Sequence, residues 1–143
     1  MSKCINCNKN EAKIKFQVFT WSGIGKSNVN FECCSEECKK EVEEFCEYVN
    51  KNVMKFFILI FLGSFSFIPF IILYNIYKNE LFGALGLTAT LGLIGVAIIL
   101  FPFSTPETNS KLGLRKAKKV TRIIGYVLLV ISIIPVIFYL IGL

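Results

Sequence analysis

The chain has 143 residues, 54% of them apolar, and a formal net charge of +6. A water-soluble domain of this length cannot bury so much apolar surface, so the composition predicts long apolar runs that enter a membrane. The sequence contains neither histidine nor aspartate, which excludes Ser-His-Asp and Cys-His catalysis and every metal site that needs imidazole. The composition therefore favours a membrane protein that is not an enzyme.

The charge is distributed unevenly along the chain. Residues 1–53 carry eight lysines and eight glutamates and are formally neutral, so the whole excess of +6 lies in 54–143. A nucleic-acid-binding head would carry a basic face, and we therefore expect no nucleic-acid partner. The N-terminus lacks the apolar core of a cleavable signal peptide, so we expect the internal apolar runs to drive insertion.

Residues 1–50 are predicted to form a small α+β head. Residues 12–21 alternate as a strand does, 22–25 supply turn residues, and 28–33 can return as a second strand. Residues 35–50 follow with the pattern of an amphipathic helix that packs on the hairpin. The expected N-cap and the apolar packing positions of this helix are Ser35, then Val42, Phe45, Cys46 and Val49.

Four cysteines frame these elements in two pairs. Cys4-x-x-Cys7 precedes the hairpin, and Cys34-x-x-x-Cys38 lies at the start of the helix. Zinc takes four thiolates in a tetrahedron, and the free N–H groups of a helix start stabilise thiolates. We therefore expect these four cysteines to bind one Zn²⁺, which would staple a head too small for a sizeable core.

Alternatives for the cysteines are an iron centre with the same ligands and a head without metal. Disulfides are disfavoured because the predicted compartment is reducing. Cys46 lies two turns beyond Cys38 on the apolar face of the helix, so it is expected to be a small core residue rather than a fifth ligand. A redox pair of Cys33 and Cys46 is the other interpretation, and nothing in the sequence favours it.

The segment Phe31-Glu32-Cys33-Cys34-Ser35-Glu36-Glu37-Cys38 resembles the FCSxxC knuckle of treble-clef zinc fingers of the MYM/TRASH type, with Cys4-x-x-Cys7 as the first knuckle. The resemblance covers about residues 4–46 and none of the apolar part. A hydrophobic residue usually precedes the Cys-Ser pair in that family; Cys33 takes this place, so we assign Cys33 to packing and Cys34 to the metal. The resemblance implies a treble-clef-like module for protein interaction or metal handling.

Three apolar runs are predicted to span a membrane: 54–77, 81–103 and 123–143. Each is near the roughly 20 residues that a helix needs to cross a bilayer. The one charged residue within these ranges is Lys55, which flanks the start of the first run. In hydrocarbon the backbone must satisfy its own hydrogen bonds, so the runs should be helical. Pro69 and Pro135 are expected to kink the first and third helices. An all-α membrane domain, 54–143, is therefore expected to follow the head.

Charge in the connections predicts the topology. The short connection 78–80 makes the first two spans an antiparallel hairpin, whereas 104–122 is long and basic. By the positive-inside rule this basic loop is cytoplasmic, which places the head on the same side and the C-terminus outside. The protein is thus expected to be an integral, multi-pass membrane protein. The basic residues of the loop are Lys111, Arg115, Lys116, Lys118, Lys119 and Arg122.

The basic loop has two interpretations. Thr105-Pro106-Glu107 is typical of a helix start, which favours a short helix at headgroup level, although a solvated loop fits as well. Its basic residues are expected to contact either anionic lipid headgroups or the metallated head, because four thiolates around Zn²⁺ carry an excess of two negative charges.

The second span carries a stripe of small residues at Ala84, Thr88 and Gly92. Small residues let helix backbones approach closely, either among the spans of this chain or against a partner membrane protein or a second copy. The spans contain no ionisable residue of the kind that transport requires.

These observations lead to a functional hypothesis. We expect a non-enzymatic membrane protein that presents a zinc finger to the cytoplasm as an adaptor or accessory subunit. The alternative is a metal-sensing or metal-trafficking head attached to a membrane complex. A third, less favoured hypothesis is an enzyme that uses cysteine nucleophiles.

Overall fold

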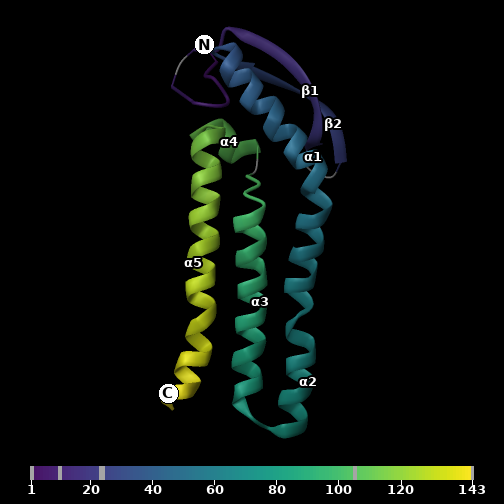
Figure 1. Cartoon of the computed structure of the whole chain (residues 1–143), viewed down its shortest axis with the longest axis vertical. Helices are drawn as coiled ribbons and strands as arrows, with labels where there is room; N and C mark the ends of the chain where they lie inside the picture. Colours follow the sequence, from purple (N-terminus) through teal and green to yellow (C-terminus); the bar gives the residue numbers. More distant parts are fainter. Residues whose placement is uncertain (1, 10, 23–24, 105, 143) are drawn as a thin grey trace. The chain divides into compact units, whose positions relative to one another are not determined.

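The computed structural model describes residues 2–9, 11–22, 25–104 and 106–142. Two strands and five helices follow one another along these residues (Figure 1). They form two compact units. The first comprises Met1–Met54 and Pro102–Thr121, and the second comprises Lys55–Phe101 and Arg122–Leu143. The basic segment before the third apolar run therefore folds together with the N-terminal head.

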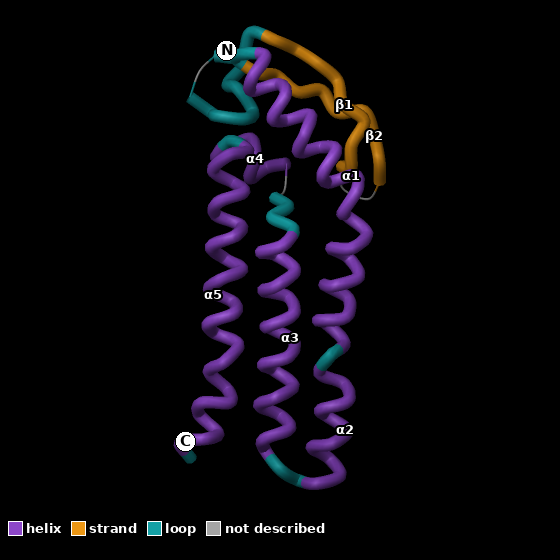
Figure 2. Tube along the Cα trace, viewed as in Figure 1, coloured by secondary structure: helices purple, strands orange, loops and turns teal. Residues whose placement is uncertain are grey.

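The first unit begins with the predicted β-hairpin, drawn in orange in Figure 2. Strand β1 (Ile14–Ser22) pairs antiparallel with β2 (Gly25–Cys33). The register places Ile14 opposite Cys33 and Ser22 opposite Gly25. The strand pairing therefore extends to Gly25, and β2 begins earlier than residue 28, where the sequence predicts its start. The predicted turn residues Gly23 and Ile24 lie outside the described residues.

Helix α1 (Glu36–Phe65) begins where the sequence predicts it. The Ser35 hydroxyl oxygen accepts a hydrogen bond from the Cys38 backbone N–H at 3.3 Å, as an N-cap does. The helix does not end at Asn50, however, and continues into the first apolar run. Residues 51–53 contain neither glycine nor proline, so nothing in them ends a helix.

The core of the first unit joins three parts of the chain. The buried side chains of this core lie under the hairpin and along the first turns of α1, and one of them comes from the start of helix α5 (Leu114–Ile141). Short helix α4 (Pro106–Leu112) precedes α5 and begins at the proline that the sequence predicts as its first residue; Thr105, the predicted N-cap, lies outside the described residues. The buried members of this core are Cys4, Cys33, Cys38, Val42, Phe45, Cys46 and Leu114.

The second unit consists of long apolar helices. Within the described chain, three helical segments are long and apolar enough to cross a membrane: Glu36–Tyr77, Glu80–Leu100 and Leu114–Ile141. The first is interrupted at Ser66, between α1 and helix α2 (Phe67–Tyr77), as the short loop segment in Figure 2 shows. Pro69 causes this break, because it lacks an N–H and its ring clashes with the carbonyl of Phe65. Helix α5 continues through Pro135.

Glycines bring the helices of the second unit into contact. Helix α3 (Glu80–Leu100) packs its Gly86 against Phe70 of α2, where an added Cβ would lie 3.0 Å from the Phe70 Cβ. Its Gly95 faces Gly125 of α5, and a Cβ on either glycine would lie 3.0 Å from the other's carbonyl oxygen. An added Cβ on Gly92 of the predicted stripe would contact Ser132 of α5. Small residues of α3 thus pack against the chain's own helices.

Candidate metal centre

Four cysteine side chains converge in the first unit. The sulfur atoms of Cys4, Cys7, Cys34 and Cys38 all lie within 4.8 Å of one another. The Cys7 and Cys34 sulfurs are 3.8 Å apart, and those of Cys34 and Cys38 are 3.7 Å apart. Four sulfurs in a tetrahedron about 2.3 Å from a zinc ion are separated by about 3.8 Å from one another. The cluster that the sequence predicts is therefore compatible with one bound metal ion.

Each pair of cysteines is positioned by a different element. Cys4 and Cys7 lie in a tight turn that is closed by a hydrogen bond from the Asn8 N–H to the Cys4 carbonyl. The turn is attached to the end of β2, because the Ile5 N–H donates to the Glu32 carbonyl at 2.9 Å. Cys34 and Cys38 flank the first residues of α1, one turn apart. The short turn supplies two sulfurs and the start of the helix supplies the other two, and all four face the same point, as the CxxC and CxxxC spacings allow.

The local backbone favours thiolate at Cys4. Burial opposes ionisation of this thiol, but hydrogen bonds from the backbone of Cys7, Cys34 and Asn6 together lower its pKa to about 6. Burial and the neighbouring thiols have the opposite effect on Cys34 and raise its pKa to about 12. Closely spaced sulfurs cannot all ionise without a compensating charge. A divalent cation at the centre would supply that charge and hold all four as thiolates.

The other two cysteines lie outside the cluster. Cys33 is fully buried, and burial raises the pKa of its thiol to about 12. Cys46 is buried in the α1 core, and burial raises its pKa as well. Both therefore have the environment of inert packing residues rather than of reactive thiols. All six cysteines are free thiols in the structure.

The metal-binding turn also holds the start of α5. The backbone N–H groups of Leu114 and Arg115 donate to the carbonyls of Ile5 and Asn6, at 2.9 and 3.2 Å. Ile5 and Asn6 are the two residues between Cys4 and Cys7. The first N–H groups of a helix have no partner within the helix, so the turn satisfies two of them for α5.

Gly113 permits this close approach. Its φ of +79° is a conformation that residues with a side chain rarely adopt. An added Cβ at Gly113 would lie 2.8 Å from the Asn6 carbonyl oxygen and 3.0 Å from the Asn8 Cβ. Next to it, the Asn8 side-chain amide donates to the Lys111 carbonyl at 2.5 Å. Glycine is therefore required where α4 ends against the turn.

A polar network secures the same contact. The buried Asn6 side chain donates to a Glu41 carboxylate oxygen at 2.8 Å. Arg115 donates to both oxygens of this carboxylate, at 2.7 and 2.5 Å. Hydrogen bonds from Arg115 and Asn6 lower the pKa of Glu41 to about 2. Sequence reasoning did not identify this network, although the position of Asn6 between two ligands is a signal that could have found it.

The basic segment divides into two groups of residues. Arg115 pairs with Glu41, and the Lys118 ammonium lies 4.3 Å from the centre of the Phe45 ring. The segment thus contacts the head, as one of the two sequence interpretations expects. The remaining basic side chains are exposed: Lys111, Lys116, Lys119 and Arg122.

No protein-family model, curated protein or solved structure matches this chain. The treble-clef resemblance of residues 31–38 therefore stays a prediction.

Proposed function

We propose that this chain is a non-enzymatic membrane protein whose N-terminal unit is folded by one zinc ion and serves as an adaptor or accessory subunit. The ligands would be the thiolates of Cys4, Cys7, Cys34 and Cys38. The observation that carries the proposal is the convergence of their sulfurs: all four lie within 4.8 Å of one another, and two pairs are 3.7 and 3.8 Å apart, close to the edge of a tetrahedral zinc site. Zinc would supply charge and cross-linking without redox chemistry.

The size of the head supports a structural role for the metal. The buried core of the first unit is small, and three of its seven members are cysteines that ligate or flank the proposed ion: Cys4, Cys33 and Cys38. A unit of this size needs additional cross-links to fold stably. Binding of zinc to four cysteines contributes about 10–16 kcal/mol in small zinc domains, which is enough to decide whether the unit folds.

The two chain segments that make up the first unit support the proposed membrane topology. Residues 1–54 and 102–121 belong to one compact unit, and two crossings separate them in the sequence. We therefore infer that both segments lie on the same side of the membrane. The basic residues of 104–122 favour the cytoplasmic side by the positive-inside rule. We propose a cytoplasmic head, where the reducing environment keeps the thiols available for metal.

Metal analysis of single-cysteine variants tests the proposal. The full-length protein, purified without chelator, is expected to contain one zinc ion per chain, and Cys38→Ser is expected to lose it together with the protease resistance of residues 1–54. Cys46→Ala is the matched control, because Cys46 is equally buried but lies outside the cluster; it is expected to retain the ion. Iron in place of zinc, or a wild-type head that resists protease without metal, would overturn the proposal.

A second function, metal sensing, is favoured by one specific observation. The carbonyls of Ile5 and Asn6, between two proposed ligands, accept hydrogen bonds from the first residues of α5. Occupancy of the metal site would therefore affect how the third apolar helix begins. A sensor should exchange zinc readily with a competing chelator, whereas a structural site should release it only on unfolding. Exchange of radioactive zinc into the folded protein distinguishes the two functions.

A further inference from the structure

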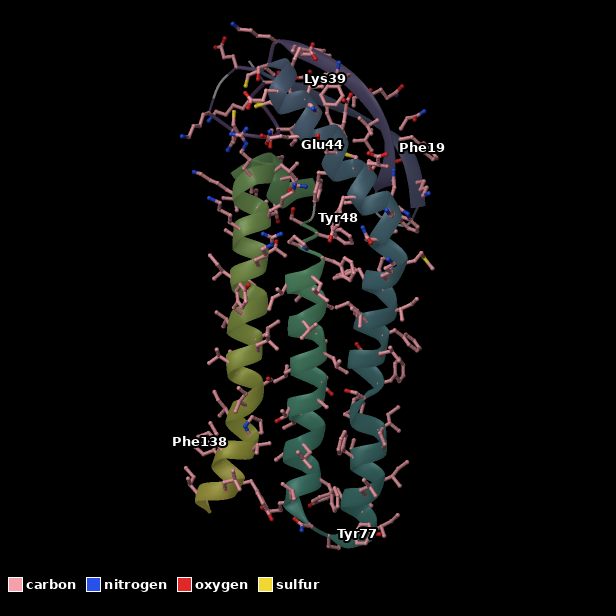
Figure 3. All side chains as sticks on the ribbon, in the orientation of Figure 1. Phe19, Lys39, Glu44, Tyr48, Tyr77 and Phe138 are labelled. Carbon is pink, nitrogen blue, oxygen red and sulfur yellow. The ribbon has the colours of Figure 1, made fainter. Side chains whose placement is uncertain are left out.

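The β-hairpin runs alongside the first half of α1. Near the start of α1, the Lys39 ammonium lies 5.9 Å from the centre of the Phe16 ring of β1. Farther along, the Asn50 side-chain amide donates to the Phe19 carbonyl at 2.8 Å. Figure 3 labels Lys39 near the beginning of α1, and Phe19 on the hairpin. The turn end of the hairpin therefore lies at the level of Asn50, four residues before Met54 in the same helix.

Helix geometry gives the distance between this point and the membrane. Asn50 and Met54, the first residue of the apolar run, belong to the same helix. Four residues of α-helix span about 6 Å along the axis, and any tilt of the helix brings Asn50 closer to the hydrocarbon. The headgroup layer on each side of a bilayer is about 5–7 Å thick. The backbone of Phe19 is therefore within reach of the headgroup layer when the apolar run crosses a bilayer.

The side chains on the outward face of β1 change from polar to aromatic towards the turn end of the hairpin. Successive residues of a strand point to opposite faces, and along β1 the exposed positions are Lys15, Gln17 and Phe19, whereas the intervening Phe16, Val18 and Thr20 face α1 and are less exposed. The Phe19 side chain is 57% exposed. Trp21, which is half-buried, follows in the same register, and its cross-strand partner Lys26 is exposed. Polar residues thus give way to aromatic ones with a flanking lysine.

We propose that Phe19, Trp21 and Lys26 form an interfacial anchor that places the hairpin end in the lipid headgroup layer. Aromatic side chains are enriched at this depth because their rings suit the boundary between headgroups and acyl chains. Lys26 can extend its ammonium to the phosphates while its aliphatic stem stays among the rings. The proposed partner of the anchor is the lipid surface that surrounds the first span, not another protein.

The single tryptophan of the chain makes the proposal testable in the unmodified protein, because all tryptophan fluorescence comes from Trp21. The full-length protein would be placed in phosphatidylcholine nanodiscs that contain lipids brominated either near the headgroup or near the acyl-chain ends. Trp21 emission is expected to be quenched mostly by the bromines near the headgroup. Aqueous iodide is expected to quench it little.

Two variants sharpen the experiment. Phe19→Ser removes one aromatic ring from the proposed anchor and is expected to weaken quenching by lipid and to strengthen quenching by iodide. The matched control carries Trp21→Phe with Gln17→Trp, which moves the probe along the same face by about 13 Å. Its emission is expected to respond to iodide and not to brominated lipid. This control shows whether depth, rather than tryptophan in general, determines the result.

Three outcomes would overturn the proposal. Strong quenching of Trp21 by iodide alone would place the hairpin end in water. Quenching that is strongest from bromines near the acyl-chain ends would place it in the hydrocarbon. Protection from both quenchers would show that protein, such as a second copy of the chain, covers this edge. The readout here is quenching of Trp21 rather than metal content, so a failure of this proposal can be distinguished from a failure of the proposed metal site.

Discussion

The two units of this chain are stabilised by different kinds of contact. The first depends on a few specific polar groups that come from distant parts of the sequence, including the cysteine cluster and the hydrogen bonds that join residues 5–8 to 111–115. The second depends on shape, because glycines allow α2, α3 and α5 to pack while most large apolar side chains remain exposed for lipid. Single changes should therefore damage one unit and spare the other.

Metal removal is expected to have the largest effect, and only on the first unit. The contribution of structural zinc, about 10–16 kcal/mol, equals or exceeds the whole stability of a typical domain, about 5–15 kcal/mol. A strong chelator should therefore unfold residues 1–54 and leave the apolar helices intact. Hydrogen exchange followed by mass spectrometry, in detergent, would report both units in one measurement. Loss of protection in 67–100 as well would show that the two units are not independent.

Gly125→Ala is expected to have the largest effect on the second unit. The added Cβ would lie 2.7 Å from Ile99 and 3.0 Å from the Gly95 carbonyl oxygen, so α3 and α5 must move apart. We expect a loss of about 1–3 kcal/mol, typical of overpacking. The matched control is Gly83→Ala, because an added Cβ there has no atom within 4 Å. Thermal unfolding in detergent should separate the two variants, and zinc content should be unchanged in both.

Gly113→Ala tests the contact between α4, α5 and the metal-binding turn. The positive φ and the Asn6 carbonyl oxygen 2.8 Å away both oppose a side chain at this position. We expect a loss of about 1–3 kcal/mol from backbone strain, seen as faster hydrogen exchange at Leu114 and Arg115. Gly25→Ala is the control, since an added Cβ there meets nothing within 4 Å. Unchanged exchange in Gly113→Ala would show that α5 does not depend on the turn.

Local sequence patterns were sufficient to predict the elements of both units. The alternation of 12–21, the N-cap at Ser35 and the apolar runs each depend on neighbouring residues, and the structure confirms the hairpin, the start of α1 and the three long apolar helices. The four-cysteine cluster was predictable for the same reason, because each pair needs only one short turn. Zinc itself stays a prediction.

Contact between the basic loop and the head was one of two interpretations of the sequence, but the atoms that make this contact could not be predicted. It rests on the carbonyls of Ile5 and Asn6, and every residue type presents the same carbonyl to a partner. The side-chain contact of Asn8 with the Lys111 carbonyl connects positions 103 residues apart, a separation at which no periodic pattern gives information. The prediction that the head helix ends at Asn50 was wrong, because 51–53 contain no residue type that ends a helix.

Arg115→Ala is expected to have the smallest effect and to test whether the polar network or the backbone contact dominates in the first unit. The pair of Arg115 with Glu41 is bidentate but half exposed to solvent, so its loss should cost only about 1 kcal/mol. Lys116→Ala is the matched control, because Lys116 is exposed on the same turn of α5. Limited proteolysis at 106–121 should be faster for Arg115→Ala than for Lys116→Ala. If Arg115→Ala instead releases the segment as fully as Gly113→Ala does, the charged pair and not the backbone contact holds α5 on the metal-binding turn.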